Sequence, residues 1–325
     1  MSAEVEGTPV QSPAPIVEPH ENNHRWKLLS KMSGNPVVLK ELRGRMRGRQ
    51  AFVLLTLYLG LISLFIGVIY AVMVRQSSYV GWDPSFRQEV GKAVFGSVVL
   101  LEFLMLGFIG PGLTSGAVSG ERERQTFDLL RTTLLSARSF VLGKLGASFT
   151  YLFLLILTAV PIQSLAFLLG GVGLGEMLVS SLMLVVTALF LCALGLFFSS
   201  VMKRTLAATL SSYGAILLSI VLIVITFLLI TYFNSEISDS EKTKAYLLTL
   251  LAWFFISSNP FLAAVASEIF LVEDQSLFLI KIPLLGSSST EITLPSPWII
   301  YVIFFVIFTL TLIYLSIRRV SRADR

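Results

Sequence analysis

The stretch Ser119-Gly-Glu-Arg-Glu-Arg-Gln-Thr-Phe-Asp-Leu-Leu-Arg131 is the densest group of charged residues between two long apolar runs. Read as a helix it is amphipathic, because its charged residues recur at i, i+3, i+7 and i+10 on one face. These residues are Glu121, Arg124, Asp128 and Arg131. The acids Glu121 and Glu123 fall in the first turn, where the helix dipole favours negative charge. The stretch predicts a short charged helix that either presents a rigid surface to a soluble partner or only turns the chain around between two spans.

The chain as a whole is strongly apolar. Of its 325 residues, 54% are hydrophobic and 14% are charged, and the mean hydropathy is +0.80. A soluble domain of this size cannot bury so much apolar surface, so the sequence predicts an all-α polytopic membrane protein. The one cysteine, Cys192, cannot form an internal disulfide, and His20 and His24 have no acids at ligand spacing. We therefore expect no metal site.

Two polar segments precede the first apolar run. Residues 1–24 are rich in Pro, Glu, Ser and Asn, and we expect a disordered cytoplasmic tail there. We expect no signal peptide, because the first apolar run begins too late and is too long. Residues 25–50 are strongly basic, and Asn35-Pro36 is a typical helix start.

The basic segment predicts an interfacial amphipathic helix whose side chains reach anionic lipid headgroups. The polar residues assigned to it are Lys40, Glu41, Arg43, Arg45 and Arg47. A plain positive-inside anchor explains the same charges equally well. Nucleic-acid binding does not fit a segment so close to a span.

Six long apolar runs follow within residues 51–325 and predict six transmembrane helices. They cover Phe52–Val74, about residues 93–118, Leu145–Leu169, Met177–Met202, Leu206–Phe233 and Pro297–Ile317. The second span carries Glu102 near mid-membrane, where a carboxylate is costly. Two interpretations of Glu102 are open. In the functional one it is a substrate-path or proton-sensitive acid, and in the structural one it is protonated and forms a hydrogen bond to a neighbouring helix. Pro111-Gly112 in the same span predicts a kink, which serves either as a hinge or as a static bend.

The segment 245–268 is apolar and long enough to cross, but Asn259-Pro260 interrupts it, and proline disfavours helix at the residue before it. With six spans, most of the 25 lysines and arginines fall in loops on one side of the membrane. This bias predicts a protein of the inner, cytoplasmic membrane with both termini in the cytoplasm. A seventh crossing would put the arginine-rich C-terminus outside. We therefore predict an extracytoplasmic re-entrant hairpin that turns at Asn259-Pro260 before the sixth span and is sheltered by other helices.

From about residue 30 onward the chain resembles the membrane-spanning subunits of type 2 ATP-binding cassette (ABC-2) transporters. The matching motifs are Asn35-Pro36 with Lys40-Glu41-Leu42, then Ser119-Gly-Glu-Arg-Glu with Thr126-Phe-Asp-Leu-Leu130, Ser136 and Leu142-Gly-Lys144, and finally Asn259-Pro260-Phe261. The block from Ser119 to Lys144 is the specific part, because six apolar spans alone say little. The sequence departs from the family at Leu134, where the family commonly has Pro near the end of the charged helix. This departure leaves the end of that helix open.

The resemblance implies a cytoplasmic coupling helix at residues 120–135, between spans two and three, that docks in a groove of a separate ATPase subunit. The residues implied at that contact are Glu121, Arg122, Glu123, Arg124, Thr126, Asp128 and Arg131. It also implies a second permease subunit, identical or related, and ATP with magnesium bound by the ATPase rather than by this chain. The residues agree with this division, because the chain has no G-x-x-x-x-G-K-[ST] loop and no soluble stretch long enough for a nucleotide-binding domain.

The main hypothesis is therefore a permease subunit of an exporter, without catalytic residues of its own, that couples ATP hydrolysis in a partner to substrate movement. The alternative is a membrane scaffold or assembly subunit of an ATPase-linked complex that moves no solute. A substrate that accumulates on one side only when ATP is hydrolysed separates the two. An intramembrane enzyme fits poorly, because the spans hold no Ser/His, His-Glu-x-x-His or paired Asp constellation. Lipids, amphiphilic drugs, peptides and glycans all remain open as substrates.

Overall fold

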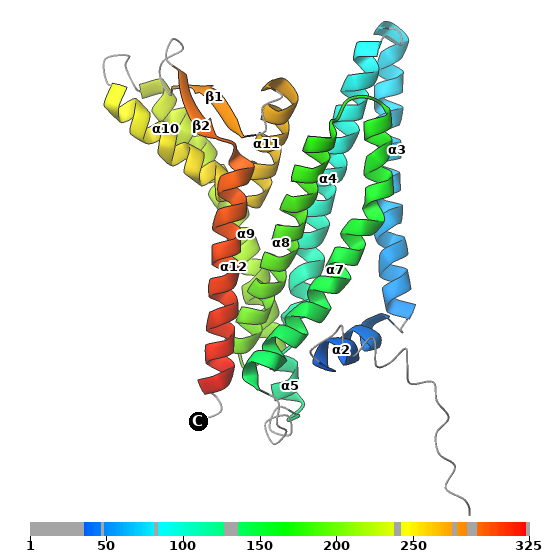
Figure 1. The fold of residues 1–325 in the computed structure, drawn as a ribbon, viewed down its shortest axis with the longest axis vertical. Coiled ribbons are helices and arrows are strands. Elements are labelled where there is room, and N and C mark those ends of the chain that lie inside the picture. The colour runs from blue at the N-terminus through cyan, green and yellow to red at the C-terminus, as the bar shows by residue number, and fades with distance from the viewer. Residues whose placement is uncertain are drawn as a thin grey trace, which may run out of the picture.

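Six long helices form the body of the molecule (Figure 1). The computed structural model describes residues 36–46, 49–80, 84–126, 136–236, 242–274, 278–284 and 291–322. The six helices are α3 (Arg49–Val80), α4 (Pro84–Thr114), α7 (Ala137–Leu168), α8 (Leu174–Val201), α9 (Thr205–Glu236) and α12 (Pro297–Arg322). Each is long and apolar enough to cross a membrane. The prediction of a helical multi-pass membrane protein is confirmed, whereas the tail predicted at residues 1–24 lies outside the described residues.

Helix α8 is the centre of the packing. It packs against α4, α7, α9 and α12, and 61% of its most apolar window is buried inside the protein. Helices α3 and α9 lie at the edges, and none of the corresponding window of α9 is buried. Their apolar side chains therefore face the surroundings of the protein, as expected for helices in contact with lipid or with another membrane subunit.

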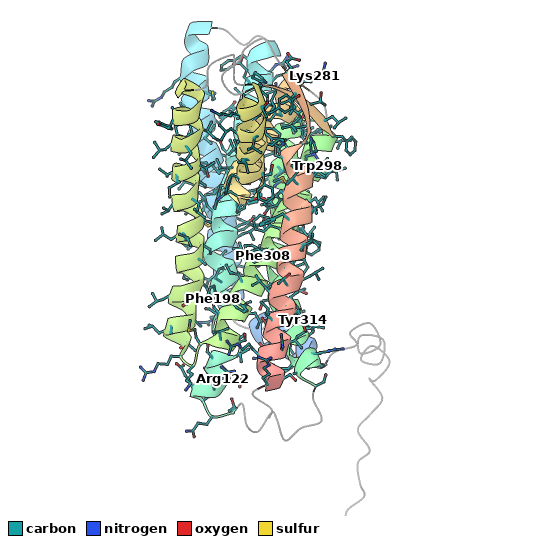
Figure 2. All side chains as sticks on the ribbon, turned by 90° about the vertical axis from the view of Figure 1, so that its left-hand side faces the viewer. Arg122, Phe198, Lys281, Trp298, Phe308 and Tyr314 are labelled. Atoms are coloured by element: carbon teal, nitrogen blue, oxygen red, sulfur yellow. The ribbon has the colours of Figure 1, made fainter. Side chains whose placement is uncertain are left out.

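The two ends of the helix body differ in character (Figure 1). The short helices α2 (Pro36–Met46) and α5 (Ser119–Glu123) lie at the same end as the C-terminal end of α12. Helices α10 (Lys242–Ser257) and α11 (Pro260–Asp274) and a two-stranded sheet lie toward the opposite end. Figure 2 shows Arg122 at the first end and Lys281 at the other, with Phe308 between them. The first end is called the α5 end below.

Helices α10 and α11 form a bent pair that breaks at Asn259-Pro260, where the sequence predicts the turn of a hairpin. Their axes differ by 105° at the break between Ser257 and Pro260. Asn259 caps α11, because its Oδ1 accepts from the backbone N–H of Phe261 at 3.0 Å, while its Nδ2 donates to the Ser219 carbonyl of α9 at 2.9 Å. In Figure 1, α10 descends from the end opposite α5 and α11 returns to that end.

The prediction of an all-α fold needs one correction, because the chain also forms a β-hairpin. Strands β1 (Leu279–Pro283) and β2 (Glu291–Pro295) pair antiparallel, with Ile280 opposite Leu294 and Ile282 opposite Ile292. These four side chains are buried in a small cluster with Trp253 of α10, whose indole N–H donates to the Pro295 carbonyl at 2.9 Å. The alternation of apolar and polar residues that predicts a strand is present, but it spans only five residues in each strand.

Gly195 allows a close approach between α8 and α4. A Cβ atom at this position would lie 2.1 Å from Thr114 Oγ1 and 3.1 Å from the Cα atom of Pro111. Small residues at helix contacts let backbones come together where no water drives association. Gly195 is therefore required by the packing of α8 against the last turn of α4.

We expect Gly195→Ala to lower the free energy of unfolding by roughly 1–3 kcal/mol, because the added methyl group overpacks a backbone contact. The measurement is thermal unfolding of the purified protein in detergent. Gly214→Ala on α9 is the matched control, since a Cβ atom there meets no heavy atom within 4 Å. Equal melting temperatures for the two variants would contradict the assigned role of Gly195.

Candidate functional site

Helix α5 is shorter than the helix predicted over residues 120–135. It ends at Glu123, and Gln125 adopts a left-handed conformation with φ of 58°. The backbone N–H of Gln125 donates to the Arg122 carbonyl and that of Thr126 to the Glu121 carbonyl, at 3.1 and 3.0 Å. These two bonds form the Schellman motif that terminates helices. The prediction of a continuous helix through these residues is therefore wrong, and Asp128, Arg131 and Leu134 lie outside the described residues.

Ser199 of α8 holds the start of α5. Its Oγ accepts the backbone N–H groups of Val118 and Ser119 at 2.9 and 3.0 Å, and it lies 3.2 Å from the Ser119 hydroxyl. The first N–H groups of a helix have no partner within the helix. Here a buried hydroxyl from another helix accepts two of the N–H groups at this end, which fixes α5 to α8.

Lys144 joins three elements at the α5 end. Its ammonium group lies 3.0 Å from Glu121 Oε1 of α5 and 3.1 Å from Glu41 Oε1 of α2, while Lys144 itself belongs to α7. The side chain of Lys144 is only 8% exposed, and those of Glu121 and Glu41 are 27% and 26% exposed. The Thr126 hydroxyl donates to the second carboxylate oxygen of Glu121. Both carboxylates are thus held by one cation in a partly water-excluded place.

Arg122 and Glu123 attach α5 to the connection between α8 and α9. The guanidinium group of Arg122 donates to the carbonyls of Ser200 and Met202, at 3.1 and 3.3 Å, at the C-terminal end of α8. Cations are favoured there, because the last carbonyls of a helix have no partner within it. The carboxylate of Glu123 accepts from the backbone N–H and the hydroxyl of Thr205, both at 2.9 Å, at the first residue of α9.

A polar cavity of about 460 Å³ lies beside these contacts. Its charged lining consists of Glu41, Glu121, Glu123, Arg124 and Lys144. The cavity wall therefore carries three acidic and two basic side chains at the α5 end of the molecule. Thr205 and the α4–α5 turn complete its wall.

The interfacial-helix residues of α2 separate into two groups. Lys40 and Arg43 are exposed, as expected for side chains that reach outward. Glu41 instead lies inward against Lys144. The side chain of Arg45 and the whole of Arg47 lie outside the described residues.

Glu102 does not meet the cluster at the α5 end. It is fully buried in the middle of α4, and Nε2 of Gln163 on α7 lies 3.0 and 2.8 Å from its two carboxylate oxygens. These contacts agree with the structural interpretation of Glu102, in which the side chain forms a hydrogen bond to a neighbouring helix.

Pro111-Gly112, predicted to kink the second span, lies within α4, which continues as a helix to Thr114. Proline removes one backbone N–H and disturbs the bonds of the turn before it. Hydroxyl groups supply donors there, because Tyr213 of α9 donates to the Phe108 carbonyl at 2.6 Å and Thr114 donates to the Gly110 carbonyl at 3.1 Å.

A second cavity, of about 470 Å³, lies between α4, α8, α9, α12 and the turn from α10 to α11. Its aromatic lining consists of Phe103, Phe190, Phe254, Phe255, Phe261, Phe304, Phe305 and Phe308. Asn259 and Pro260 form part of its wall, whereas Glu102 is not among the lining residues. The volume lies in the range of roughly 300–1,000 Å³ in which ligand sites occur. The cavity suits an apolar group.

The structure adds three residues that the sequence analysis did not single out as site residues. In the sequence, Lys144 is named only as part of the Leu142-Gly-Lys144 motif. Its position directly before an apolar run is the signal that could have indicated a lysine paired with an acid. Ser199 and Gln163 carry no local signal, because their partners Ser119 and Glu102 lie 80 and 61 residues away.

No protein-family model matches the chain, and no curated protein sequence matches it either. The function must therefore be argued from the residues and their geometry.

Replacing Lys144 by Met leaves Glu41 and Glu121 close together without their shared cation. We expect the free energy of unfolding to fall by roughly 1–3 kcal/mol. Arg138→Met, at an exposed position of the same helix, serves as the control and changes it by about 0.5 kcal/mol or less.

The same substitution is then repeated in a protein that carries Glu41→Gln and Glu121→Gln. Lys144→Met costs less there, since no carboxylate is left without a cation. An equal cost in both backgrounds, measured by thermal unfolding in detergent, would show that the ion pairs do not hold this junction.

Proposed function

We propose that this chain is the membrane-spanning permease subunit of an ABC-2 type exporter, which couples ATP hydrolysis in a separate ATPase subunit to movement of a substrate across the cytoplasmic membrane. The observation that carries the proposal is the attachment of α5. Its consecutive residues Glu121, Arg122 and Glu123 bind α7, the end of α8 and the start of α9, respectively.

Such an attachment suits a coupling element. A force on the short helix from outside reaches four other helices through direct contacts: α2 and α7 through Lys144, α8 through Arg122, and α9 through Glu123. Rigid-body displacement through packed elements and their hydrogen bonds is a common way to transmit a conformational change. The proposal also assigns Asp128 and Arg131, which lie outside the described residues, to the contact with the ATPase.

The polar cavity supplies the rest of the proposed ATPase contact, and α2 supplies a contact with the membrane surface. Arg124 is exposed at the end of α5 and lines the cavity with Glu123. Lys40 and Arg43 on α2 are exposed at the same end and contact anionic lipid headgroups in this proposal. In this proposal the α5 end and both termini lie in the cytoplasm, and the lysines and arginines of the sequence near this end support that orientation.

The opposite end then lies outside the cell. There the α10–α11 pair acts as a re-entrant hairpin in the outer leaflet. Both of its helices pack against α12, and α10 also packs against α9, which shelters the hairpin from lipid. The exposed apolar surfaces of α3 and α9 accommodate a second permease subunit or lipid. The apolar cavity beside Asn259 offers a place for an apolar part of the substrate.

A pull-down with matched charge reversals tests the proposal. The full chain is tagged at its C-terminus, extracted from native membranes in mild detergent, and its partners are identified by mass spectrometry. We expect an ATP-binding cassette ATPase with the wild type and roughly tenfold less with Arg124→Glu, a factor that corresponds to about 1.4 kcal/mol. Arg87→Glu makes the same change at an exposed arginine near the opposite end of α4 and retains the ATPase.

Arg124 is a sharper probe than Glu121, because Glu121→Arg would also break the ion pair with Lys144 inside the chain. Absence of any such ATPase from the wild-type sample under several extraction conditions would refute the proposal. An ATPase that is retained by Arg124→Glu would place its contact elsewhere. If the complex hydrolyses ATP but vesicles accumulate no solute, the chain is a scaffold subunit instead.

A further inference from the structure

Glu102 is sealed inside the helix body. Its exposed fraction is 0%, and the neighbouring side chains Gln163 and Tyr58 are 2% and 1% exposed. Gln163 belongs to α7 and bonds the carboxyl group of Glu102 on α4, and Tyr58 belongs to α3, which also packs against α4. An isolated ionised carboxylate in such surroundings is strongly unfavourable unless a cation or a proton neutralises it.

No cation lies near enough for that task in the described part of the chain. The nearest lysine along α4 is Lys92, ten residues away, which is about 15 Å of helix rise. On α7, Lys144 is about 28 Å of helix rise from Gln163 and is already bound to Glu41 and Glu121. On α3 the basic residue closest in sequence to Tyr58 is Arg49, about 13 Å of helix rise away.

The other helices that pack against α4 add acids rather than cations. Helix α8 has Glu176 in its first turn, α9 has Glu236 at its end, and α11 carries Glu268, Glu273 and Asp274. Titratable groups nearer the middle of α8 and α9 are Cys192 and Tyr213, both neutral in their ordinary state. Glu102 therefore has to be neutralised by something other than a side chain.

The hydrogen bonds of Gln163 indicate what neutralises it. Its Nε2 group donates to Glu102, but its Oε1 atom is buried and has no hydrogen-bond partner among the described residues. A carboxylate only accepts hydrogen bonds and cannot satisfy this oxygen, whereas a protonated carboxyl group also donates one. One proton on Glu102 would thus remove both the buried charge and the unsatisfied amide oxygen.

We propose that Glu102 and Gln163 form a proton-binding site in the middle of the membrane-spanning part. In the bound state the Glu102 hydroxyl donates to Gln163 Oε1, and Gln163 Nε2 donates to the other carboxyl oxygen. Binding of one proton changes the charge of Glu102 from −1 to zero. The hydroxyl of Tyr58 on α3 is also buried without a hydrogen-bond partner among the described residues.

A proton fits this site better than a metal cation. The available oxygens are the two of Glu102 and Oε1 of Gln163, and only Glu102 is acidic. Hard cations such as Ca²⁺ and Mg²⁺ take roughly six or more oxygen ligands. The described residues also hold no group of three or more His, Cys, Asp or Glu side chains placed for a metal ion.

Infrared absorption of the purified full-length protein tests the site. At neutral pH exposed carboxyl groups are already ionised, so a protonated-carboxyl band that shifts in heavy water reports a buried acid. We expect this band in the wild type and its loss in Glu102→Gln. The exchanged variant Glu102→Gln/Gln163→Glu keeps the acid–amide pair in the opposite order and therefore regains the band. Gln163→Leu retains the acid but shifts the band to higher frequency, because the amide bonds are lost.

Absence of the band in the wild type, or a band that Glu102→Gln leaves unchanged, would overturn the proposal. A melting temperature that rises with sodium but not with potassium, in the wild type and not in Glu102→Gln, would assign the site to sodium instead. If Glu102→Gln does not fold, Gln163→Leu decides alone, since an unshifted band places the proton elsewhere. None of these outcomes depends on the ATPase, so this proposal and the proposed function fail independently.

Discussion

The ammonium group of Lys144 is the contact on which the α5 end of the molecule depends. It forms ion pairs with Glu121 of α5 and Glu41 of α2, two acids whose mutual repulsion in a partly buried place it reduces. Removal of one member of such a cluster leaves a charge without a partner, which costs more than the net gain from forming the pair. One side chain of α7 thus forms ion pairs with both short helices at this end, in addition to the packing of α2 on α7 and the other attachments of α5.

Around this cluster, side chains take over the hydrogen bonds that short helices and helix ends leave open. Ser199 accepts at the start of α5, Arg122 donates at the end of α8, and Glu123 accepts at the start of α9. A helix of five residues has too few internal bonds to be stable alone. The charged residues of α5 thus build the junction between helices, in addition to forming any surface for a partner.

The features that the sequence predicts well are those with a local cause. The spans follow from long apolar runs, and the break before α11 follows from Asn259-Pro260, where Asn caps and Pro begins the helix. The end of α5 was missed because its left-handed residue is Gln125, whereas Gly is the usual signal. The pairing of Glu102 with Gln163 could not be read from the sequence, since no local pattern relates residues 61 positions apart.

Helix α7 is attached to the α4–α5 segment at two levels with the same spacing. Lys144 binds Glu121 at the α5 end, and Gln163 binds Glu102 deeper in the helix body. Lys144 and Gln163 are 19 residues apart on α7, and Glu102 and Glu121 are also 19 residues apart on the α4–α5 segment. In a helix this separation corresponds to about 28 Å. Two polar attachments that far apart prevent α7 from tilting or sliding against α4 unless one of them breaks. In the proposed coupling role, a displacement of α5 would therefore carry α4 and α7 together, and α9 is joined to the same segment by Thr205 and Tyr213. The apolar cavity lies between α4 and helices α8, α9 and α12, so neither of the two attachments crosses it.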